Sequence, residues 1–330
     1  MKFIIHHPGK AGEVFMALPA AQLLKKHYPD SRIKWVILDL YRDALGDNPY
    51  IDEIDVIPTY SCRNLYDVNV HIRKHRTFIL DGQRSVEDHW GIHIDLYYGY
   101  IIERIKSNEW KLNRHPFYLQ MFNNAVHFCP GADLIESWTY PEWHPTKQAV
   151  NDCEEFEKLY GGGPVIIFSP FIADKTATKD NVTRFNMDLI YTELRKWNLP
   201  LIVTGTQWDE KVFPTWAIDG YAPTLSLGGL FCLMKERAVL VITPNSGIGF
   251  AAHWLGAPVL MIDNRTGWQE QVKEYKAKYP LLADDAHPNE HRWPMFMKEY
   301  FPPKHLLPIP FEQIEWSEDG FVEALSKMRK

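Results

Sequence analysis

The N-terminal part of the chain alternates short apolar runs with segments of helical periodicity. Residues 3–7, 34–38 and 52–58 (FIIHH, KWVIL and DEIDVIP) are mostly apolar and short, which predicts buried strands. Residues 15–29 place apolar side chains at helical spacing on one face, and residues 41–45 predict a shorter helix. Strands that alternate with helices are typical of a parallel sheet with right-handed crossovers. We therefore predict a Rossmann-like unit here.

The same alternation returns in the C-terminal half. The predicted strands are residues 165–169, 199–205, 238–243 and 258–263, and the predicted helices are residues 185–197, 229–237, 246–255 and a segment that begins at Asp209. This order predicts a second Rossmann-like unit. Ligands of such folds bind at the carboxyl ends of the strands, so we expect the functional residues in the turns that follow them.

The middle of the chain is less regular. Residues 85–150 are rich in His, Trp, Tyr and Pro, and within them residues 92–106 predict a helix. A short apolar run at residues 78–80 is a candidate for a further strand. The function of this region is therefore harder to infer from periodicity than that of the two flanking units.

The length and the two alternating regions predict two domains. A chain of 330 residues exceeds what a single small core usually organises. We predict an N-terminal Rossmann-like domain over residues 1–155 and a second over residues 156–310. Residues 311–330 are expected to form a helix that packs back across the domain boundary. The predicted fold class is α/β, with the two domains facing each other across a ligand-binding cleft.

Charge and composition narrow the class of function. The net charge is −6 and there is no long block of Lys and Arg, which argues against nonspecific nucleic-acid binding and adhesion to anionic membranes. No apolar run approaches the roughly 18 residues that a membrane span requires. The first residues lack the apolar core of a signal peptide, so we expect a cytoplasmic protein. The four cysteines form no CxxC pair, which predicts free, packed thiols.

The turn after the first predicted strand carries a candidate catalytic base. Gly9 and Gly12 allow the backbone to turn tightly and approach a ligand. For a group-transfer reaction at this turn, we expect Gly12 to contact the donor substrate and Lys10 to contact the acceptor substrate. Glu13 stands at the start of the next helix, where its carboxylate could take a proton from an attacking hydroxyl. A carboxylate in a first turn also complements the helix dipole, and this simpler role stays open.

A second turn predicts a phosphate site. Residues 243–259 (TPNSGIGFAAHWLGAPV) end a strand, turn and begin a helix. Backbone N–H groups at such a helix start suit a diphosphate, which makes Asn245, Ser246 and Gly247 candidate donor contacts, with Gly249 allowing close approach. An ordinary capped helix is the alternative, since Asn and Ser are common there.

Two further turns supply candidate donor contacts. Thr204, Gly205 and Asp209 follow a predicted strand, and an acid at this place could accept hydrogen bonds from ribose hydroxyls. Ser169 ends another strand, and Arg184 precedes the next helix, from which a guanidinium could reach a diphosphate. Charged residues in such loops are also common as solvated surface groups.

These pieces, in this order, resemble the lipopolysaccharide heptosyltransferases of glycosyltransferase family nine. The N-terminal stretch GKAGEVFMALPAAQLLKKHYPDSRIKWVI contains a Leu-Pro-Ala step, at residues 18–20, that is similar to the opening of the family, as is NPYIDEIDVIP at residues 48–58. The best C-terminal match is AVLVITPNSGIGFAAHWLGAPVLMI at residues 238–262. Residues 60–160 carry no match.

The resemblance implies a GT-B fold, inversion at the anomeric carbon, and neither a metal ion nor a separate cofactor. Glu13 occupies the position of the family's base. Arg184 falls nearest to the cation that contacts the donor phosphates, Asp209 matches the acid that contacts ribose, and residues 245–247 match the turn that holds the diphosphate. The implied donor is a nucleotide-diphosphate sugar, with ADP-linked heptose favoured, and the acceptor is a glycan or other hydroxyl compound.

The chain also departs from the family's pattern. Glu13 replaces an aspartate and is longer by one methylene, Asn245 replaces an aspartate, and Phe250 stands where a histidine is usual. None of these changes disables phosphate binding by backbone N–H groups. They bear instead on the sugar and base of the donor, and the change at Glu13 bears on the acceptor hydroxyl.

The acceptor is expected to contact the N-terminal domain. The unmatched aromatic segment offers His89, His93 and Tyr97 as candidate acceptor contacts. The same residues would also suit an amphipathic helix packed in the core.

Two other functions remain open for a double-Rossmann chain. One is a nucleotide-sugar epimerase of the same shape, and the other is a non-catalytic relative that binds a nucleotide or a glycan. Retention of a carboxylate at Glu13 favours an enzyme over the second of these. A dehydrogenase is disfavoured, because GKAGE lacks the GxGxxG spacing of a dinucleotide site.

Overall fold

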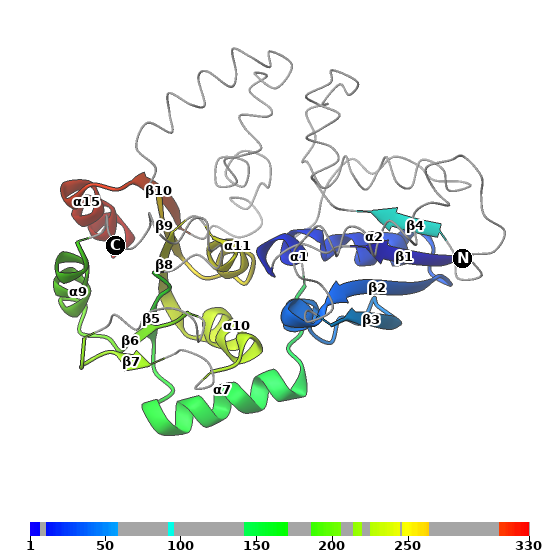
Figure 1. Cartoon of the computed structure of the whole chain (residues 1–330), viewed down its shortest axis with the longest axis horizontal. Helices are drawn as coiled ribbons and strands as arrows, with labels where there is room; N and C mark the ends of the chain where they lie inside the picture. Colours follow the sequence, from blue (N-terminus) through cyan, green and yellow to red (C-terminus); the bar gives the residue numbers. More distant parts are fainter. Residues whose placement is uncertain are drawn as a thin grey trace, which may run out of the picture. The chain divides into compact units, whose positions relative to one another are not determined.

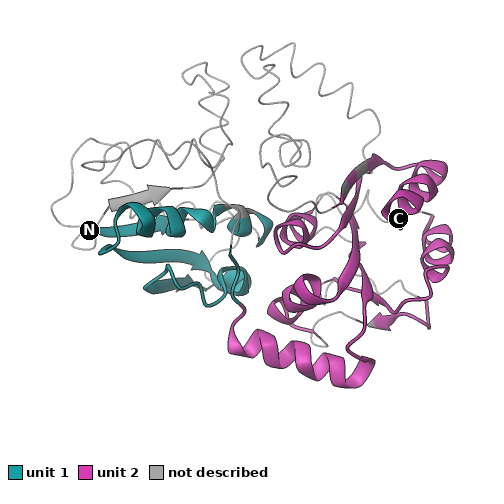
Figure 2. Ribbon diagram, turned by 180° about the vertical axis from the view of Figure 1, so that it is seen from behind, with its two compact units in different colours: residues 1–144, 276–290, 299–301 teal, residues 145–275, 291–298, 302–330 magenta. Residues whose placement is uncertain are grey.

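The chain folds into two α/β units. The structure, a computed structural model, describes residues 1–6, 11–58, 92–95, 142–170, 186–205, 214–219, 225–244, 246–263 and 310–329. Among these residues, those up to His144 form unit 1, and those from Pro145 onward form unit 2 (Figure 2). Each unit is built around its own parallel sheet. The predicted α/β class with two Rossmann-like halves is confirmed.

Unit 1 contains a four-stranded parallel sheet with the order β3-β2-β1-β4. Its strands are β1 (Lys2–His6), β2 (Arg32–Leu38), β3 (Glu53–Ile57) and β4 (Ile92–Asp95). The strand order reverses at β1, because β2 and β3 lie on one side of it and β4 lies on the other. Phe3, Ile5 and Trp35 are fully buried, in keeping with the nearly continuous apolar strands of a parallel sheet.

The first helical segment of unit 1 is divided at a proline. One helix was predicted over residues 15–29, whereas the structure has α1 (Ala11–Ala17) and α2 (Pro19–His27). Pro19 is the first residue of α2, a position that needs no backbone N–H donor, and its ring disfavours continuation of the preceding turn. Leu23 and Leu24 lie on the buried face of α2, as the periodicity predicts.

Residues 92–95 correct a prediction. We predicted a helix over residues 92–106, but Ile92–Asp95 is strand β4, which pairs with β1 so that Phe3 lies opposite Ile92 and His6 opposite Asp95. The sequence IHID alternates β-branched and polar residues with a period of two, which is the signal of a strand. The remainder of the predicted helix, and the candidate strand at residues 78–80, lie outside the described residues.

Unit 2 contains a six-stranded parallel sheet with the order β10-β9-β8-β5-β6-β7. Its strands are β5 (Val165–Phe168), β6 (Leu201–Val203), β7 (Ile218–Asp219), β8 (Ala238–Pro244), β9 (Val259–Asp263) and β10 (Phe311–Glu315). Numbered along the chain, this is the 3-2-1-4-5-6 order of a complete Rossmann fold. Four of these strands were predicted, whereas β7 and β10 were not.

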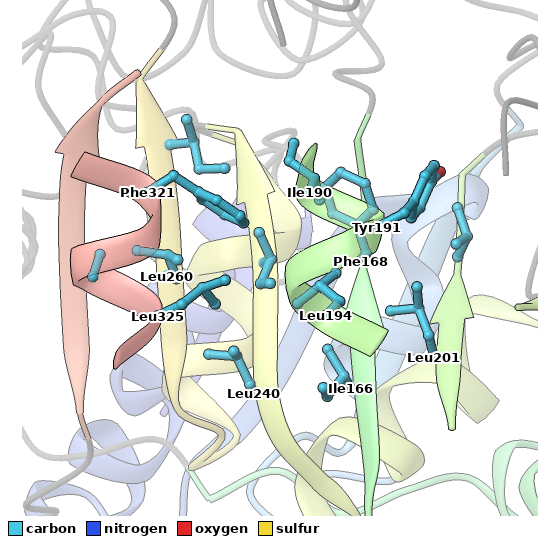
Figure 3. Packing of buried hydrophobic residues seen from close by; sticks show 14 residues of the cluster. Ile166, Phe168, Ile190, Tyr191, Leu194, Leu201, Leu240, Leu260, Phe321 and Leu325 are labelled. Carbon is cyan, nitrogen blue, oxygen red and sulfur yellow. The ribbon is translucent and has the colours of Figure 1, made fainter. Parts of the chain in front are cut away.

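Helices cover both faces of the unit 2 sheet (Figure 1). On one face lie α9 (Met187–Arg195) and α15 (Glu318–Met328), and on the other lie α10 (Leu227–Glu236) and α11 (Gly247–Trp254). Figure 3 shows the core beneath α9 and α15, where Phe168, Ile190 and Phe321 meet between the helices and the strands. The buried face of each helix therefore fixes its position on the sheet, as expected for a three-layer fold.

The C-terminal helix packs within unit 2. Phe321 and Leu325 of α15 are buried against Leu260 of β9 (Figure 3). Arg329 donates a hydrogen bond to the carbonyl of Lys196. These described contacts lie inside unit 2, and packing of this helix across the domain boundary stays a prediction. Residues 311–315, which we assigned to the helix, instead form strand β10, which adds to the edge of the sheet and delivers the chain to the start of α15.

Helix α7 (Lys147–Tyr160) begins unit 2 and packs on α10. The predicted boundary between residues 155 and 156 falls inside this helix, eleven residues beyond the division at His144. Gly229 allows the contact, because a Cβ there would lie 3.1 Å from Cβ of Asp152. Cys153 and Cys232 are buried on these two helices as free thiols, in agreement with the prediction.

Candidate functional site

Hydroxyl groups gather where the central strands of unit 2 end. Ser169 follows β5, Thr204 follows β6 and Thr243 lies near the end of β8, and all three are buried. Backbone hydrogen bonds join these ends, because Ser169 N–H donates to Ile242 O at 2.9 Å and Thr204 N–H donates to Phe168 O at 2.9 Å. The strand order reverses between β5 and β8, so this edge is the topological switch point at which Rossmann-like folds bind ligands.

Helix α11 begins at this switch point without a side-chain cap. Its N-cap residue, Ser246, has an extended backbone, but its hydroxyl lies 2.8 Å from Oγ1 of Thr243 instead of capping the helix. The N–H of Gly249 donates to the carbonyl of Ser246. Among the described residues, none accepts from the N–H groups of Gly247 and Ile248. Within the described part of the chain, these two groups have no acceptor, and they lie at the positive end of the helix dipole, where anions bind.

The other helices of unit 2 begin differently. The N-cap side chains of α7, α9, α10 and α15 all accept a hydrogen bond from the N–H three residues later, and they are Thr146, Asn186, Ser226 and Ser317. The start of α11 is therefore the exception among the described helices of this unit. The exception falls at the switch point, where a ligand would supply the missing acceptor.

Gly249 sets how closely α11 approaches the sheet. A Cβ at this position would lie 2.5 Å from Cε of Met261 and 2.8 Å from Cγ2 of Thr243. We predicted that Gly249 lets the backbone approach a ligand, whereas its open side faces β8 and β9. The glycine thus acts indirectly, because it seats α11 against the strands and holds the start of the helix at the edge of the sheet.

The far end of α11 contributes no positive charge at neutral pH. His253 is 2% exposed, and burial lowers its pKa to about 4. The imidazole is therefore neutral at pH 7. Phe250, which stands where the resembling family has a histidine, is also buried. With both side chains buried, the described part of α11 offers an anion its backbone N–H groups.

The candidate base lies at the switch point of unit 1. Gly12 and Glu13 belong to the first turn of α1, which follows β1, and β1 is the strand at which the order of this sheet reverses. Val14 and Phe15 are fully buried and fix α1 on unit 1. The backbone therefore places Glu13 at the carboxyl edge of the sheet, where a ligand of unit 1 is expected. The side chain of Glu13 lies outside the described part of the structure.

The candidate acceptor contacts are described only in part. His93 lies on β4, paired with Ile4 of β1, so its backbone is on the strand next to the one that leads to Glu13. Its side chain lies outside what is described. Six other candidates are residues that the structure does not describe, namely Lys10, His89, Tyr97, Arg184, Asp209 and Asn245.

The donor-site candidates of unit 2 that are described lie together at one edge. Ser169, Thr204, Ser246 and Gly247 all follow the carboxyl ends of β5, β6 and β8, and Gly205 comes directly after Thr204. Thr243 is a member of this group that the sequence analysis missed. A threonine three residues before a serine at a strand end was the available signal.

The comparisons with known proteins agree with this geometry. No protein-family model matches the chain, and no curated protein sequence matches it. Among solved structures, it is similar to a glycosyltransferase of family nine from Veillonella parvula, with a TM-score of 0.60 and 16% identity over 99% of this chain and 96% of that one. It is also similar to the ADP-heptose lipopolysaccharide heptosyltransferase II of E. coli, with a TM-score of 0.59 and 13% identity over 99% and 98% of the two chains.

A third solved structure is an E. coli heptosyltransferase with ADP. The TM-score is 0.50 at 11% identity, over 84% of this chain and 99% of that one. At such identities, structural similarity defines the fold. The chain therefore has the GT-B fold of these glycosyltransferases, and the predicted resemblance to family nine is confirmed at the level of the fold.

Proposed function

We propose that this protein is a glycosyltransferase that moves a sugar from a nucleoside-diphosphate donor to a hydroxyl acceptor. The observation that carries the proposal is the similarity over 99% of the chain to two solved glycosyltransferases. The uncapped start of α11 at the switch point supports it independently, because this arrangement suits a diphosphate.

Unit 2 holds the donor in this proposal. The N–H groups of Gly247 and Ile248 bind the diphosphate, and the hydroxyls of Ser169 and Thr204 stand at the adjacent strand ends. Arg184 adds positive charge and Asp209 binds the ribose, as the family resemblance implies. ADP-linked heptose is the favoured donor, since one similar structure holds ADP and another holds ADP-2-deoxy-2-fluoro heptose.

The proposed reaction is a direct displacement. Glu13 takes the proton of the acceptor hydroxyl, whose oxygen forms a bond to the anomeric carbon as the bond from that carbon to the diphosphate oxygen breaks. The anomeric configuration inverts, and the nucleoside diphosphate leaves with the bonding electron pair. Backbone N–H groups, the dipole of α11 and Arg184 stabilise its growing negative charge, so no metal ion is required.

Unit 1 holds the acceptor in this proposal. Lys10, His89, His93 and Tyr97 are the proposed contacts, and the acceptor is a glycan or another hydroxyl compound. We place the reaction in the cytoplasm. No helix in the described part of the chain is long and apolar enough to span a membrane.

Ligand-dependent stability tests the donor class. The purified protein is heated with ADP, UDP, GDP, CMP, dTDP or NAD, each with EDTA and with magnesium. At about 100 times its dissociation constant, a ligand stabilises the native state by roughly 2.7 kcal/mol, a readily measured shift. We expect a selective shift with ADP that EDTA does not reduce. If no nucleoside diphosphate stabilises the protein, the proposal fails.

Transfer itself is tested with ADP-heptose and glycan acceptors, with ADP release and the product as readouts. Proton NMR of the product gives the anomeric configuration. Inversion in the presence of EDTA is the expected result. Retention, or activity that depends on an added metal ion, would contradict the displacement mechanism.

A further inference from the structure

The last residues of unit 1 are bonded to helix α3 (Arg42–Leu45) and to the turn that follows it. The indole Nε1–H of Trp143 donates to the carbonyl of Asp43 at 3.1 Å. The N–H of Asp47 donates to the carbonyl of His144 at 2.9 Å. These bonds join segments about one hundred residues apart in sequence, and they hold the chain in place immediately before it enters unit 2 at Pro145.

Gly46 fits this contact and no other residue type would. Its φ is +60°, in the region that favours glycine, and a Cβ would overlap the carbonyl oxygen of His144. The same Cβ would lie 3.0 Å from Nε1 of Trp143. The turn is therefore shaped to receive residues 143–144. We name the five residues of this contact the linker clamp: Asp43, Gly46, Asp47, Trp143 and His144.

The clamp also contacts the helix that carries the proposed base. The Trp143 side chain is 4% exposed, and its ring lies 6.0 Å, centroid to centroid, from the ring of Phe15 in α1. Phe15 is fully buried and follows Glu13 by two residues in the same short helix. A shift of the Trp143 ring would therefore move or loosen the first turns of α1.

We infer that Trp143 is a positioning residue for Glu13, acting through Phe15, and that the linker clamp fixes the orientation of α1. The inference rests on the proposed function. A general base must lie within about 2.6–3.2 Å of the proton that it takes. A displacement of about 1 Å can lower the rate about 100-fold, so α1 must be held more tightly than folding alone requires.

Three variants separate positioning from stability. Trp143→Ala removes the ring that contacts Phe15, and Trp143→Phe keeps an aromatic ring but removes the N–H donor to Asp43. The control is Ile57→Ala, because Ile57 is buried to a similar extent in a separate cluster of unit 1 with Ile4 and Leu38. For each variant we measure the folded fraction, the Kd for ADP, and kcat and KM for transfer.

The expected effect is confined to kcat. Trp143→Ala should lower kcat about 10- to 100-fold and Trp143→Phe by less, while the Kd for ADP stays within about twofold of the wild type, since unit 2 binds the donor. Ile57→Ala should keep kcat per folded molecule. Equal values of kcat for Trp143→Ala and Ile57→Ala would overturn the inference. If the wild type itself neither binds ADP nor transfers a sugar, the proposed function is what has failed.

A double-mutant cycle gives the decisive readout. If Trp143 acts by placing the Glu13 carboxylate, Trp143→Ala should have little further effect on kcat in a Glu13→Gln background. Trp143→Phe serves in the same cycle if the alanine variant does not fold. Effects of the two substitutions that multiply independently would show a general structural role and overturn the inference.

Discussion

Two neighbouring helices of unit 2 begin with the same Ser-x-x-Gly pattern and use it differently. Helix α10 follows Ser226 and α11 follows Ser246, and each serine is followed three residues later by a glycine, Gly229 or Gly249. The hydroxyl of Ser226 accepts a hydrogen bond from Gly229 N–H at 3.0 Å. The hydroxyl of Ser246 pairs with Thr243 at 2.8 Å instead.

The difference separates a structural helix start from one that we propose to bind a ligand. At α10, the protein itself satisfies the first turn, and the glycine makes room for α7. At α11, the Ser246 hydroxyl bonds to Thr243, no described residue accepts from the N–H groups of Gly247 and Ile248, and the glycine seats the helix on the sheet. Position in the fold explains this difference, because α11 follows β8 at the switch point.

The largest expected effect is the loss of turnover in Glu13→Gln, which should separate catalysis from ligand binding at the proposed site on α11. Glu13→Gln keeps the size of the side chain and removes its basicity, so it should lower kcat by about 10²- to 10⁴-fold. The Kd for ADP should stay within about twofold, because the proposed donor site is at α11. Steady-state kinetics and calorimetry measure the two quantities. A parallel loss of binding and turnover would remove Glu13 from the role of base.

The last turns of the two helices also differ, and the difference predicts a pH dependence. Lys235 lies in the last turn of α10, whereas α11 ends with the buried His253. Burial lowers the pKa of His253 from an ordinary 6.5 to about 4, so the unfolded chain takes up this proton first as the pH falls. The contribution of the neutral His253 to the free energy of unfolding should be complete above pH 6.5, and about 3 kcal/mol of it should be lost between pH 6.5 and pH 4.

Urea unfolding at pH 7 and pH 5 measures this contribution. His253→Leu removes the titration and puts an apolar side chain at this buried position, so the variant should show a smaller decrease in stability than the wild type over this interval. The same decrease in both proteins would mean that groups other than His253 produce it.

Adding one methyl group at each glycine compares the two helix starts directly. Gly229→Ala and Gly249→Ala place a Cβ 2.9 Å from Leu225 Cδ1 and 2.5 Å from Met261 Cε, respectively. Each should reduce stability by about 1–3 kcal/mol through overpacking. Only Gly249→Ala should also weaken ADP binding, since it moves the start of α11. Equal effects on ADP affinity would contradict the assignment of the donor site to α11.

The smallest expected effects come from the two serines. Ser226→Ala removes a helix cap and should reduce stability by about 1 kcal/mol without changing ADP affinity. Ser246→Ala removes no cap but leaves the buried Thr243 hydroxyl without this partner, which should loosen the turn and weaken ADP binding by about fivefold. Thermal unfolding and calorimetry on both variants check the contrast. The reverse pattern would assign the ligand-binding role to α10.

The strand–turn–helix pattern of the site could be predicted from the sequence, because its signals are local. The apolar run before Pro244 and the helical spacing after Gly247 indicate where β8 ends and α11 begins. Whether a serine hydroxyl caps its own helix or bonds to another side chain could not be predicted, since Ser226 and Ser246 stand in the same pattern. It depends on the Thr243 hydroxyl, whose position follows from the strand and the turn.

Contacts between distant segments account for the other differences. Strand β4 pairs with β1, a segment distant in sequence, and this pairing completes the strand that the alternation of IHID indicates, where we predicted a helix over residues 92–106. The role of Trp143 could not be predicted from the sequence, because its partners Asp43 and Phe15 lie about one hundred residues or more before it in the chain. A single sequence has no local signal for such pairs.

The most direct test of the donor site follows backbone amides during an ADP titration. With the protein labelled at glycine with ¹⁵N, the amide of Gly247 reports on the start of α11, and those of Gly228 and Gly229 report on the start of α10. We expect ADP to shift the Gly247 resonance in a saturable way, in the presence of EDTA, while the other two remain in place. Saturable ADP binding that leaves Gly247 unshifted, or no binding at all, would contradict the account.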